Sequence, residues 1–161
     1  MRAMRVLRLV LHAPSRQPVL LLGEIDGERC IPVFLRQPHA QAIALGPRSQ
    51  DQPLLPQDVV VPLLGGLGRT MTAAEITALT DGVFAAEVVL DDGTRTAVLP
   101  SDALALAVRF ELTIGVADEI LDEVGQPTAE LFPNGTDAPP DEQIRDFQEF
   151  LADVSPDDFK E

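Results

Sequence analysis

The stretch with the most distinctive chemistry is residues 100–107, which read Pro-Ser-Asp-Ala-Leu-Ala-Leu-Ala. Ser101 or Asp102 can accept backbone N–H groups at the start of an apolar helix over Ala103–Phe110, and the proline ends the strand before it. Asp102 can instead hold a metal ion or act as a general base. The positive end of a helix favours a charged carboxylate, which suits a metal ligand better than a general acid. Helix capping alone can explain these residue types, and a metal ligand or general base at Asp102 is the alternative interpretation.

Two further groups offer candidate chemistry. Glu24, Asp26 and Glu28 alternate around a predicted hairpin turn, and their oxygens are of the kind that binds Mg²⁺; a solvated turn is the simpler interpretation. His39 follows Pro38 at a predicted helix start. It could act as a general base because histidine exchanges protons near neutral pH, although a solvent-facing histidine is the plainer expectation.

Other recognised chemistry is missing from the sequence. It contains no phosphate-binding P-loop, dinucleotide fingerprint, zinc-protease helix, nucleophile elbow or EF-hand loop, so no organic cofactor is expected. Asp118 and Asp122, like Glu119 and Glu123, are spaced four residues apart on a short predicted helix. That spacing could bind a divalent ion, but an exposed acidic surface is the favoured interpretation.

The composition limits the classes of partner. The chain has 161 residues, of which 45% are hydrophobic, enough for one domain with a core. Twelve Lys and Arg against 26 Asp and Glu give a net charge of −14. This balance disfavours nucleic-acid binding over the whole surface, although a local basic groove remains compatible with it. With no Tyr or Trp, an aromatic base-stacking platform is not expected.

The expected location is the cytoplasm. Cys30 is the only cysteine, which fits a reducing compartment and a small core residue. No apolar run approaches the roughly 20 residues that a membrane helix needs, so no membrane association is expected. The first apolar run, Val6–Leu11, contains an arginine and predicts a strand in place of a signal peptide.

The order of patterns predicts an α+β fold: a mixed, largely antiparallel sheet with helices packed on it, plus a C-terminal amphipathic helix. Asp26-Gly27, Asp81-Gly82 and Asp91-Asp92-Gly93 are the expected hairpin turns. The predicted strands are Val6–His12, Val19–Ile25, Arg29–Phe34, Met71–Leu79, Val83–Leu90, Thr94–Leu99 and Thr113–Val116. The predicted helices are Pro38–Leu45, Asp58–Leu67 with Asp58 as its cap, Ala103–Phe110 and Asp118–Val124.

The charge divides the chain into two parts. Residues 1–127 hold 10 Arg and 16 acids, and residues 128–161 hold 2 basic and 10 acidic residues. Breaker residues follow Gly125, so we expect a compact domain over 1–127 and an acidic extension over 128–161. Within the extension, residues 141–152 carry an apolar stripe at helical spacing, which needs a partner surface. The stripe consists of Ile144, Phe147, Phe150 and Leu151.

The order of these motifs resembles the bifunctional nuclease domain family. The resemblance begins with residues 18–29 and 31–34, continues through 42–45, 81–86 and the Pro-Ser-Asp-Ala-Leu-Ala motif at 100–105, and closes at 119–125. The tail segments 147–151 and 155–159 resemble the C-terminal extension of bacterial members. The likeness therefore covers nearly the whole chain, and the motif at 100–105 is its most specific part.

The resemblance implies an α+β domain that self-associates and, in some members, cleaves DNA and RNA. Ser101, Asp102, Arg109 and Asp58 match polar positions of the family. Four positions depart from its pattern: Gln57 stands where a histidine is common, His39 where a glutamate is, Arg36 where a glycine is, and Leu99 where an arginine is.

Two functions follow from this reasoning. In the first, a metal-dependent nuclease holds Mg²⁺ or Mn²⁺ by Asp102 and Asp58, with Glu24 as a weaker third ligand, and the metal activates the attacking water. Ser101 belongs to the same motif, Arg109 offsets phosphate charge, and His39 is the candidate base. In the second, the chain is a non-catalytic, homo-oligomeric interaction or regulatory module. The second function accounts for the net charge and for the altered polar positions.

Overall fold

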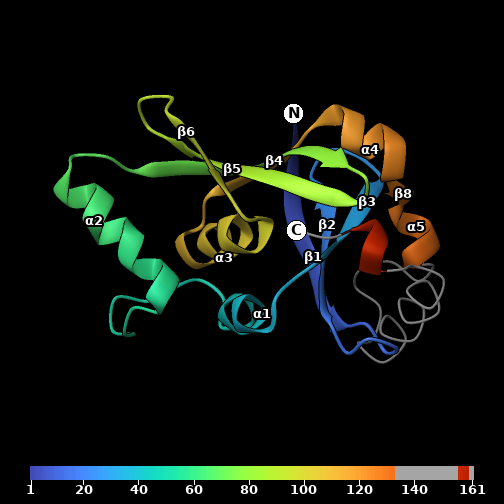
Figure 1. Ribbon diagram of the computed structural model, residues 1–161, viewed down its shortest axis with the longest axis horizontal. Coiled ribbons are helices and arrows are strands. Elements are labelled where there is room, and N and C mark those ends of the chain that lie inside the picture. The colour runs from blue at the N-terminus through green and yellow to red at the C-terminus, as the bar shows by residue number, and fades with distance from the viewer. Residues whose placement is uncertain (133–155, 160–161) are drawn as a thin grey trace.

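The computed structural model describes residues 1–132 and 156–159, and it contains one mixed sheet of eight strands with helices packed on it (Figure 1). The strands are β1 Arg2–Leu11, β2 Pro18–Glu24, β3 Arg29–Phe34, β4 Met71–Thr80, β5 Val83–Leu90, β6 Arg95–Val98, β7 Thr113–Val116 and β8 Gln126–Pro127. The helices are α1 Gln37–Ala44, α2 Val60–Gly66, α3 Pro100–Phe110, α4 Asp118–Val124 and α5 Thr128–Leu131, with 3₁₀ turns η1 Pro56–Val59 and η2 Pro156–Asp158. The α+β prediction is confirmed.

The sheet joins two antiparallel units through β7. Its order is β6-β5-β4-β7-β1-β2-β3-β8, and β4–β7 is the parallel pair among the described strands. β1 begins at Arg2, earlier than the sequence predicted, because Arg2–Met4 pair with β7. Figure 1 shows β4 and β5 running across the direction of β1 and β2, so the sheet is strongly twisted.

β2 is buried along its whole length because both faces of the sheet are covered there. Leu20 and Leu22 pack into the main core with α1, α3 and α4. Val19 and Leu21 point into a second core on the opposite face, which also contains Phe132. A strand buried on both faces reads as a continuous apolar run, which explains the Val-Leu-Leu-Leu sequence at 19–22.

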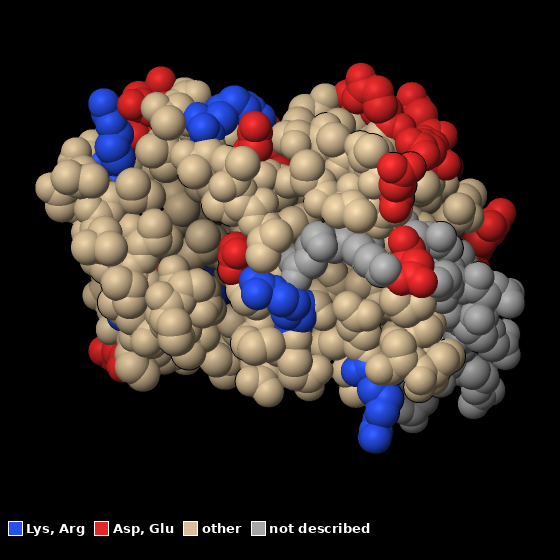
Figure 2. All heavy atoms as spheres, in the orientation of Figure 1, with Lys and Arg blue, Asp and Glu red and all other residues tan. Residues whose placement is uncertain are grey.

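The chain end returns to the sheet. Phe159 stacks against Phe34 of β3 with ring centroids 6.5 Å apart and lies 6.1 Å from Phe84 of β5. It therefore packs against both cores. The predicted helix over 141–152 lies outside the described residues. At another corner, Figure 2 shows acidic side chains gathered over α4, whose sequence is Asp-Glu-Ile-Leu-Asp-Glu-Val.

Two capping predictions are wrong. α3 begins at Pro100 with Leu99 as its N-cap and no side-chain cap, so neither Ser101 nor Asp102 caps it. The second predicted helix divides into η1 and α2, and Asp58 lies inside η1, where its Oδ2 accepts the N–H of Leu55. A proline at the start of each segment removes one N–H that would otherwise lack a partner.

No described helix is long and apolar enough to cross a membrane.

Candidate functional site

A cleft of about 640 Å³ lies where α1, η1 and the start of α3 meet. Its volume is within the range of sites that bind small ligands or single nucleotide units. Its apolar walls include Pro38, Pro56 and three leucines, and its polar side chains are those of Arg36, His39, Gln41, Gln57 and Asp102. The three leucines are Leu45, Leu55 and Leu99, and Ala42 also lines the cleft.

His39 and Asp102 meet in this cleft although they are 63 residues apart in sequence. His39 Nε2 lies 2.5 Å from Asp102 Oδ1, and the His39 side chain is 13% exposed. The expectation that His39 faces solvent is therefore wrong. It is buried because α1 packs along α3, which brings the first turns of the two helices together.

This contact determines which ring nitrogen carries the hydrogen. An ionised carboxylate only accepts hydrogen bonds, so Nε2 of a neutral His39 must donate to Asp102. Nδ1 then keeps a lone pair, and it is buried without a hydrogen-bond partner among the described residues. A buried acceptor without a partner is unfavourable by about 1–3 kcal/mol, and such atoms are candidates for a catalytic role.

Arg36 completes the polar cluster. Its Nη2 lies 3.4 Å from Asp102 Oδ1 and 3.4 Å from His39 Nε2. Since Nε2 already carries a hydrogen toward Asp102, the guanidinium donates to the carboxylate. The Arg36 side chain is 48% exposed, so this cation faces both the cleft and water.

Ser101 holds the backbone beside this cluster. It is fully buried, and its Oγ accepts the backbone N–H of Arg36 at 3.2 Å. That bond joins the start of α3 to the residue that precedes α1. Ser101 thus fixes the relative position of Arg36 and Asp102 instead of pointing into the cleft.

Asp58 and Arg109 form a separate, buried pair. Arg109 Nη2 donates to Asp58 Oδ2 at 3.0 Å, and the two side chains are 1% and 0% exposed. Arg109 Nη1 also donates to the carbonyl of Gly46 at 3.2 Å. Neither residue lines the cleft, but the pair holds η1, whose Pro56 and Gln57 form one of its walls.

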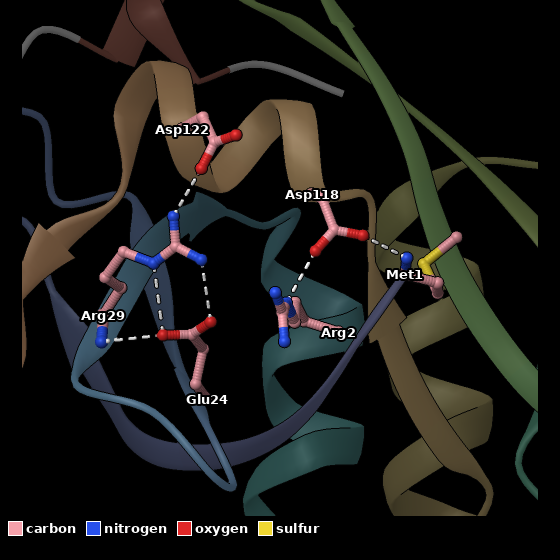
Figure 3. A network of polar contacts seen from close by, with 6 residues as sticks. All are labelled: Met1, Arg2, Glu24, Arg29, Asp118 and Asp122. Carbon is pink, nitrogen blue, oxygen red and sulfur yellow. Dashed lines mark hydrogen bonds and ion pairs between the residues drawn. The ribbon is translucent and has the colours of Figure 1, made fainter.

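Glu24 lies away from the cleft, in the network drawn in Figure 3. Its carboxylate accepts three hydrogen bonds from Arg29, one from the backbone and two from the guanidinium. These bonds lower the pKa of Glu24. Arg29 also donates to Asp122 of α4 at 2.7 Å, and Asp118 binds the Met1 ammonium and Arg2. The network ties the β2–β3 hairpin and β1 to α4.

The predicted site residues therefore fall into three places. The structure brings Asp102, His39 and Ser101 together, buries Asp58 with Arg109, and places Glu24 in the hairpin network. Sequence reasoning named Arg36 and Gln57 only as departures from a family pattern and assigned them no role. A pattern that could have identified Arg36 as a site residue is its position three residues before His39, where a strand gives way to a helix.

The donor set of the cleft does not fit a protein-held divalent cation. Asp102 is its one carboxylate, and the oxygen facing the cluster already accepts from His39 and Arg36. The guanidinium beside it would repel a cation. Within 1–132 and 156–159, no group of three or more His, Cys, Asp or Glu side chains is arranged to hold a metal ion.

Sequence similarity to known proteins shows the family of this chain. Residues 20–129 match the sequence profile of the Bifunctional nuclease domain. The chain belongs to the bifunctional nuclease domain family. It is 34% identical, over 166 aligned positions and 99% of both chains, to a protein of Mycobacterium tuberculosis strain CDC 1551 / Oshkosh that is named as uncharacterized. A protein of strain H37Rv, also named as uncharacterized, matches to the same extent.

The cleft lies entirely within the matched bifunctional nuclease domain. Arg36, His39, Gln57 and Leu99, the four positions expected from the sequence to depart from the family pattern, all line it together with Asp102. Residues scattered between positions 36 and 102 of the sequence thus converge on one cleft. The convergence makes this cleft the candidate functional site.

Proposed function

We propose that this protein is a nuclease that cleaves phosphodiester bonds in the cleft between α1, η1 and α3. The observation that carries the proposal is the 2.5 Å contact between His39 and Asp102 in a cleft of the bifunctional nuclease domain. A histidine oriented by a carboxylate is a common arrangement for general base catalysis. Cytoplasmic location is part of the proposal. It is supported by Cys30, which is buried and forms no disulfide.

The charged side chains of the cleft and His39 each have a role in this proposal. His39 is the candidate general base, and Asp102 orients its imidazole and stabilises the charged form. Arg36 offers guanidinium hydrogens to a phosphate oxygen, a geometry that suits phosphate. Ser101 acts as a positioning residue through the backbone of Arg36. The expected Mg²⁺ or Mn²⁺ has no step here because the donor set does not fit it.

The net charge of −14 does not exclude such a substrate. Arg36 and Asp102 balance each other in the cleft, so a short single strand meets a locally neutral surface with one exposed guanidinium. Contacts to phosphate groups then contribute little to the affinity for nucleic acid. We expect the protein to bind a single strand transiently and not to form a stable complex along it.

A cleavage assay tests the proposal. Purified full-length protein is incubated with labelled single-stranded RNA, single-stranded DNA and duplex DNA in Mg²⁺, Mn²⁺ or EDTA. Asp102→Asn should lower cleavage about 100-fold or more, since it removes the negative charge that stabilises the charged imidazole of His39 and replaces one carboxylate oxygen by an N–H donor. Asp26→Asn, an exposed carboxylate on the β2–β3 turn, is the matched control and should retain full activity. Equal cleavage by all three proteins would contradict the proposal.

A second candidate function is a homo-oligomeric interaction module without catalysis. The observation that favours it is α2, none of whose residues is buried, with Leu63 64% and the following Leu67 77% exposed. An apolar helix with this exposure is typical of a contact surface. Folding and self-association in EDTA, with no cleavage under any condition of the assay above, would support this function instead.

A further inference from the structure

We propose that the groove between α1 and the second half of β1 binds an extended acidic peptide of another protein, which adds a strand to the open edge of β1. The proposal does not depend on the nuclease function. The groove has a volume of about 270 Å³, and Gln41 of α1 lines both this groove and the cleft. Figure 1 shows α1 beside this half of β1.

β1 is paired on both sides only at its beginning. Arg2–Met4 pair with β7, whereas β2 follows β1 from Met4 to Leu11. Past Met4, no described strand pairs with the edge of β1 that faces away from β2. Because an unpaired edge is a template for another strand, the second half of β1 can receive one although β1 lies inside the sheet order.

The ladder with β2 shows which backbone groups lie on this open edge. The carbonyl of Pro18 accepts the N–H of Leu35 and so points toward β3. Its partner across the ladder, Leu11, then directs its own N–H and C=O away from β2, and so does Leu9. Both leucines line the groove. A peptide backbone supplies the donors and acceptors that such an edge needs, whereas the phosphates of a nucleic acid supply acceptors alone.

The face of β1 toward α1 favours apolar side chains in the added strand. Leu9 packs against the main core on this face, and α1 contributes Ala40 and Ala44 to the same groove. Alanine side chains are small, so they leave room that larger apolar side chains of a peptide can fill. The peptide would cover Leu11, which is 55% exposed, and the exposed Ala44.

The opposite face of β1 favours acidic side chains. Arg8 pairs with Leu21 of the second core, so its side chain lies on that face. Both walls of the groove come from stretches without carboxylates: residues 1–23 contain four arginines, residues 29–50 contain three, and neither stretch contains Asp or Glu. Since side chains alternate along a strand, a peptide of alternating apolar and acidic residues matches both faces.

A second copy of this chain fits the open edge less well. Pairing of β1 with β1 of another copy would bring the arginines of the two strands together. Like charges on neighbouring strands destabilise the pairing. The charge of the walls therefore favours a different, acidic chain as the occupant.

The probe is a short fluorescent peptide of alternating Val and Glu, added to the full-length protein. Fluorescence polarisation should show binding, and NMR should show that the amides of Leu9 and Leu11 become protected from hydrogen exchange. The amides of β6, the edge strand at the other end of the sheet, should exchange as before. A peptide with Lys in place of Glu should bind at least about 10-fold more weakly.

Two pairs of variants separate the backbone from the groove. Leu11→Pro removes the N–H on the open edge and keeps the ladder with β2, so it should weaken binding about 10-fold. Leu11→Ala keeps that N–H and should weaken binding less. Ala44→Phe fills the groove and should abolish binding, whereas Ala97→Phe, at an exposed position of β6, should not change it.

Two N-methylated peptides test strand addition without changing the protein, and they decide the question if Leu11→Pro is unfolded by circular dichroism. Amides of alternate residues point to opposite edges of a strand, so methylation of only one set, Val or Glu, should block binding. Equal effects of the two methylations, equal binding of the Lys peptide, or unprotected amides of Leu9 and Leu11 at about 1 mM peptide would each overturn the proposal.

Two further outcomes would assign the edge to another occupant and so overturn the proposal. One is protection of the same amides by a single-stranded oligonucleotide and not by the peptide. The other is protection that rises with protein concentration in the absence of peptide, which would indicate a second copy of the chain.

Discussion

Arg109 and Asp58 are 51 residues apart in sequence, yet the guanidinium donates to the carboxylate at 3.0 Å with both side chains removed from water. The pair joins the last turn of α3 to η1, and through Gly46 to the loop that follows α1. Each charge depends on the other because neither has solvent to stabilise it. The pair therefore positions one wall of the cleft without entering it.

Breaking the Asp58–Arg109 pair should destabilise the fold strongly. Asp58→Asn and Arg109→Gln each leave a buried charge without its partner, so each should lower the free energy of unfolding by about 3–5 kcal/mol. The double variant should lose less unfolding free energy than the two single variants lose together. The difference should be about 1 kcal/mol or more. Urea unfolding of the four proteins measures this coupling.

The exposed pair between Arg95 and Glu87 supplies the control for that cycle. Glu87→Gln should lower the unfolding free energy by no more than about 1 kcal/mol, because solvent screens the charges. A small effect of Asp58→Asn, similar to that of Glu87→Gln, would contradict the structural role assigned to the buried pair.

Most helices, strands and turns could be predicted because each depends on the residue types within a short stretch of sequence. Asp81 and Gly82 both have positive φ, at 50° and 76°, which is the backbone of a tight hairpin turn, and the Asp-Gly dipeptide signals it. The apolar run Val19–Ile25 predicted a strand, and the structure has one over Pro18–Glu24. The predicted helix over 118–124 and the strand over 113–116 have the same bounds in the structure.

The site required information that spacing along the chain does not contain. Asp102 and Arg109 are two helical turns apart, and about 10 Å of helix separates their Cα atoms along the axis. One therefore meets His39 in the cleft and the other meets Asp58 in the interior. The partner of each comes from another element, and spacing along one helix carries no information about which partner each residue meets.

Glu24 should contribute to acid stability. The hydrogen bonds from Arg29 hold its pKa below the ordinary value of 4.5, so the folded state binds fewer protons than the unfolded state near that pH. The stabilisation is complete above pH 4.5 and is lost as the pH falls through the lower pKa of the folded state. In urea titrations from about pH 6 to about pH 3, a range centred on 4.5, Glu24→Gln should show a shallower loss of stability than the unmodified protein.

A matched substitution isolates this effect. Glu123→Gln changes an exposed carboxylate on α4 and should leave the acid slope unaltered. Gly27 must be kept in these variants, since a Cβ there would lie 2.6 Å from the Glu24 carboxyl carbon. If Glu24→Gln and the unmodified protein lose stability in parallel, the carboxylate is not held by Arg29 in solution.

Cys30 should make the protein sensitive to alkali. Burial raises the pKa of its thiol from 9.0 to about 11. The folded state therefore keeps a proton that the unfolded state releases, and stability falls as the pH rises from about 9 to about 11, by roughly 1.4 kcal/mol per pH unit. Cys30→Ala should lose that slope in urea unfolding. Native protein should also resist alkylation by iodoacetamide at pH 8, about three units below this pKa, and rapid labelling would contradict the burial.

Phe159 should stabilise the fold from the chain end. Its ring contacts Phe34 and Phe84, and it packs against both cores while remaining half-buried. Phe159→Ala should lower the unfolding free energy by about 2–3 kcal/mol, less than for a fully buried aromatic residue. The unfolding free energy of Phe159→Leu should lie between those of the unmodified protein and Phe159→Ala. Thermal unfolding followed by circular dichroism measures the series, and equal midpoints would show that the chain end does not hold the sheet in solution.

The exposed apolar surface of α2 should drive self-association. Residues 59–68 contain no charged side chain, and Leu63 and Leu67 are 64% and 77% exposed. Contact through this surface would bury these side chains, and residues 59–68 would bring no charge of their own to it. Leu63→Glu should therefore shift the mass measured by light scattering toward that of a single chain, since like charges would face each other across the contact. Ile25→Glu places the same charge on an apolar residue that is 52% exposed at the β2–β3 turn, and it should leave the mass unchanged. An unmodified protein with the mass of one chain at all concentrations would contradict this role for α2.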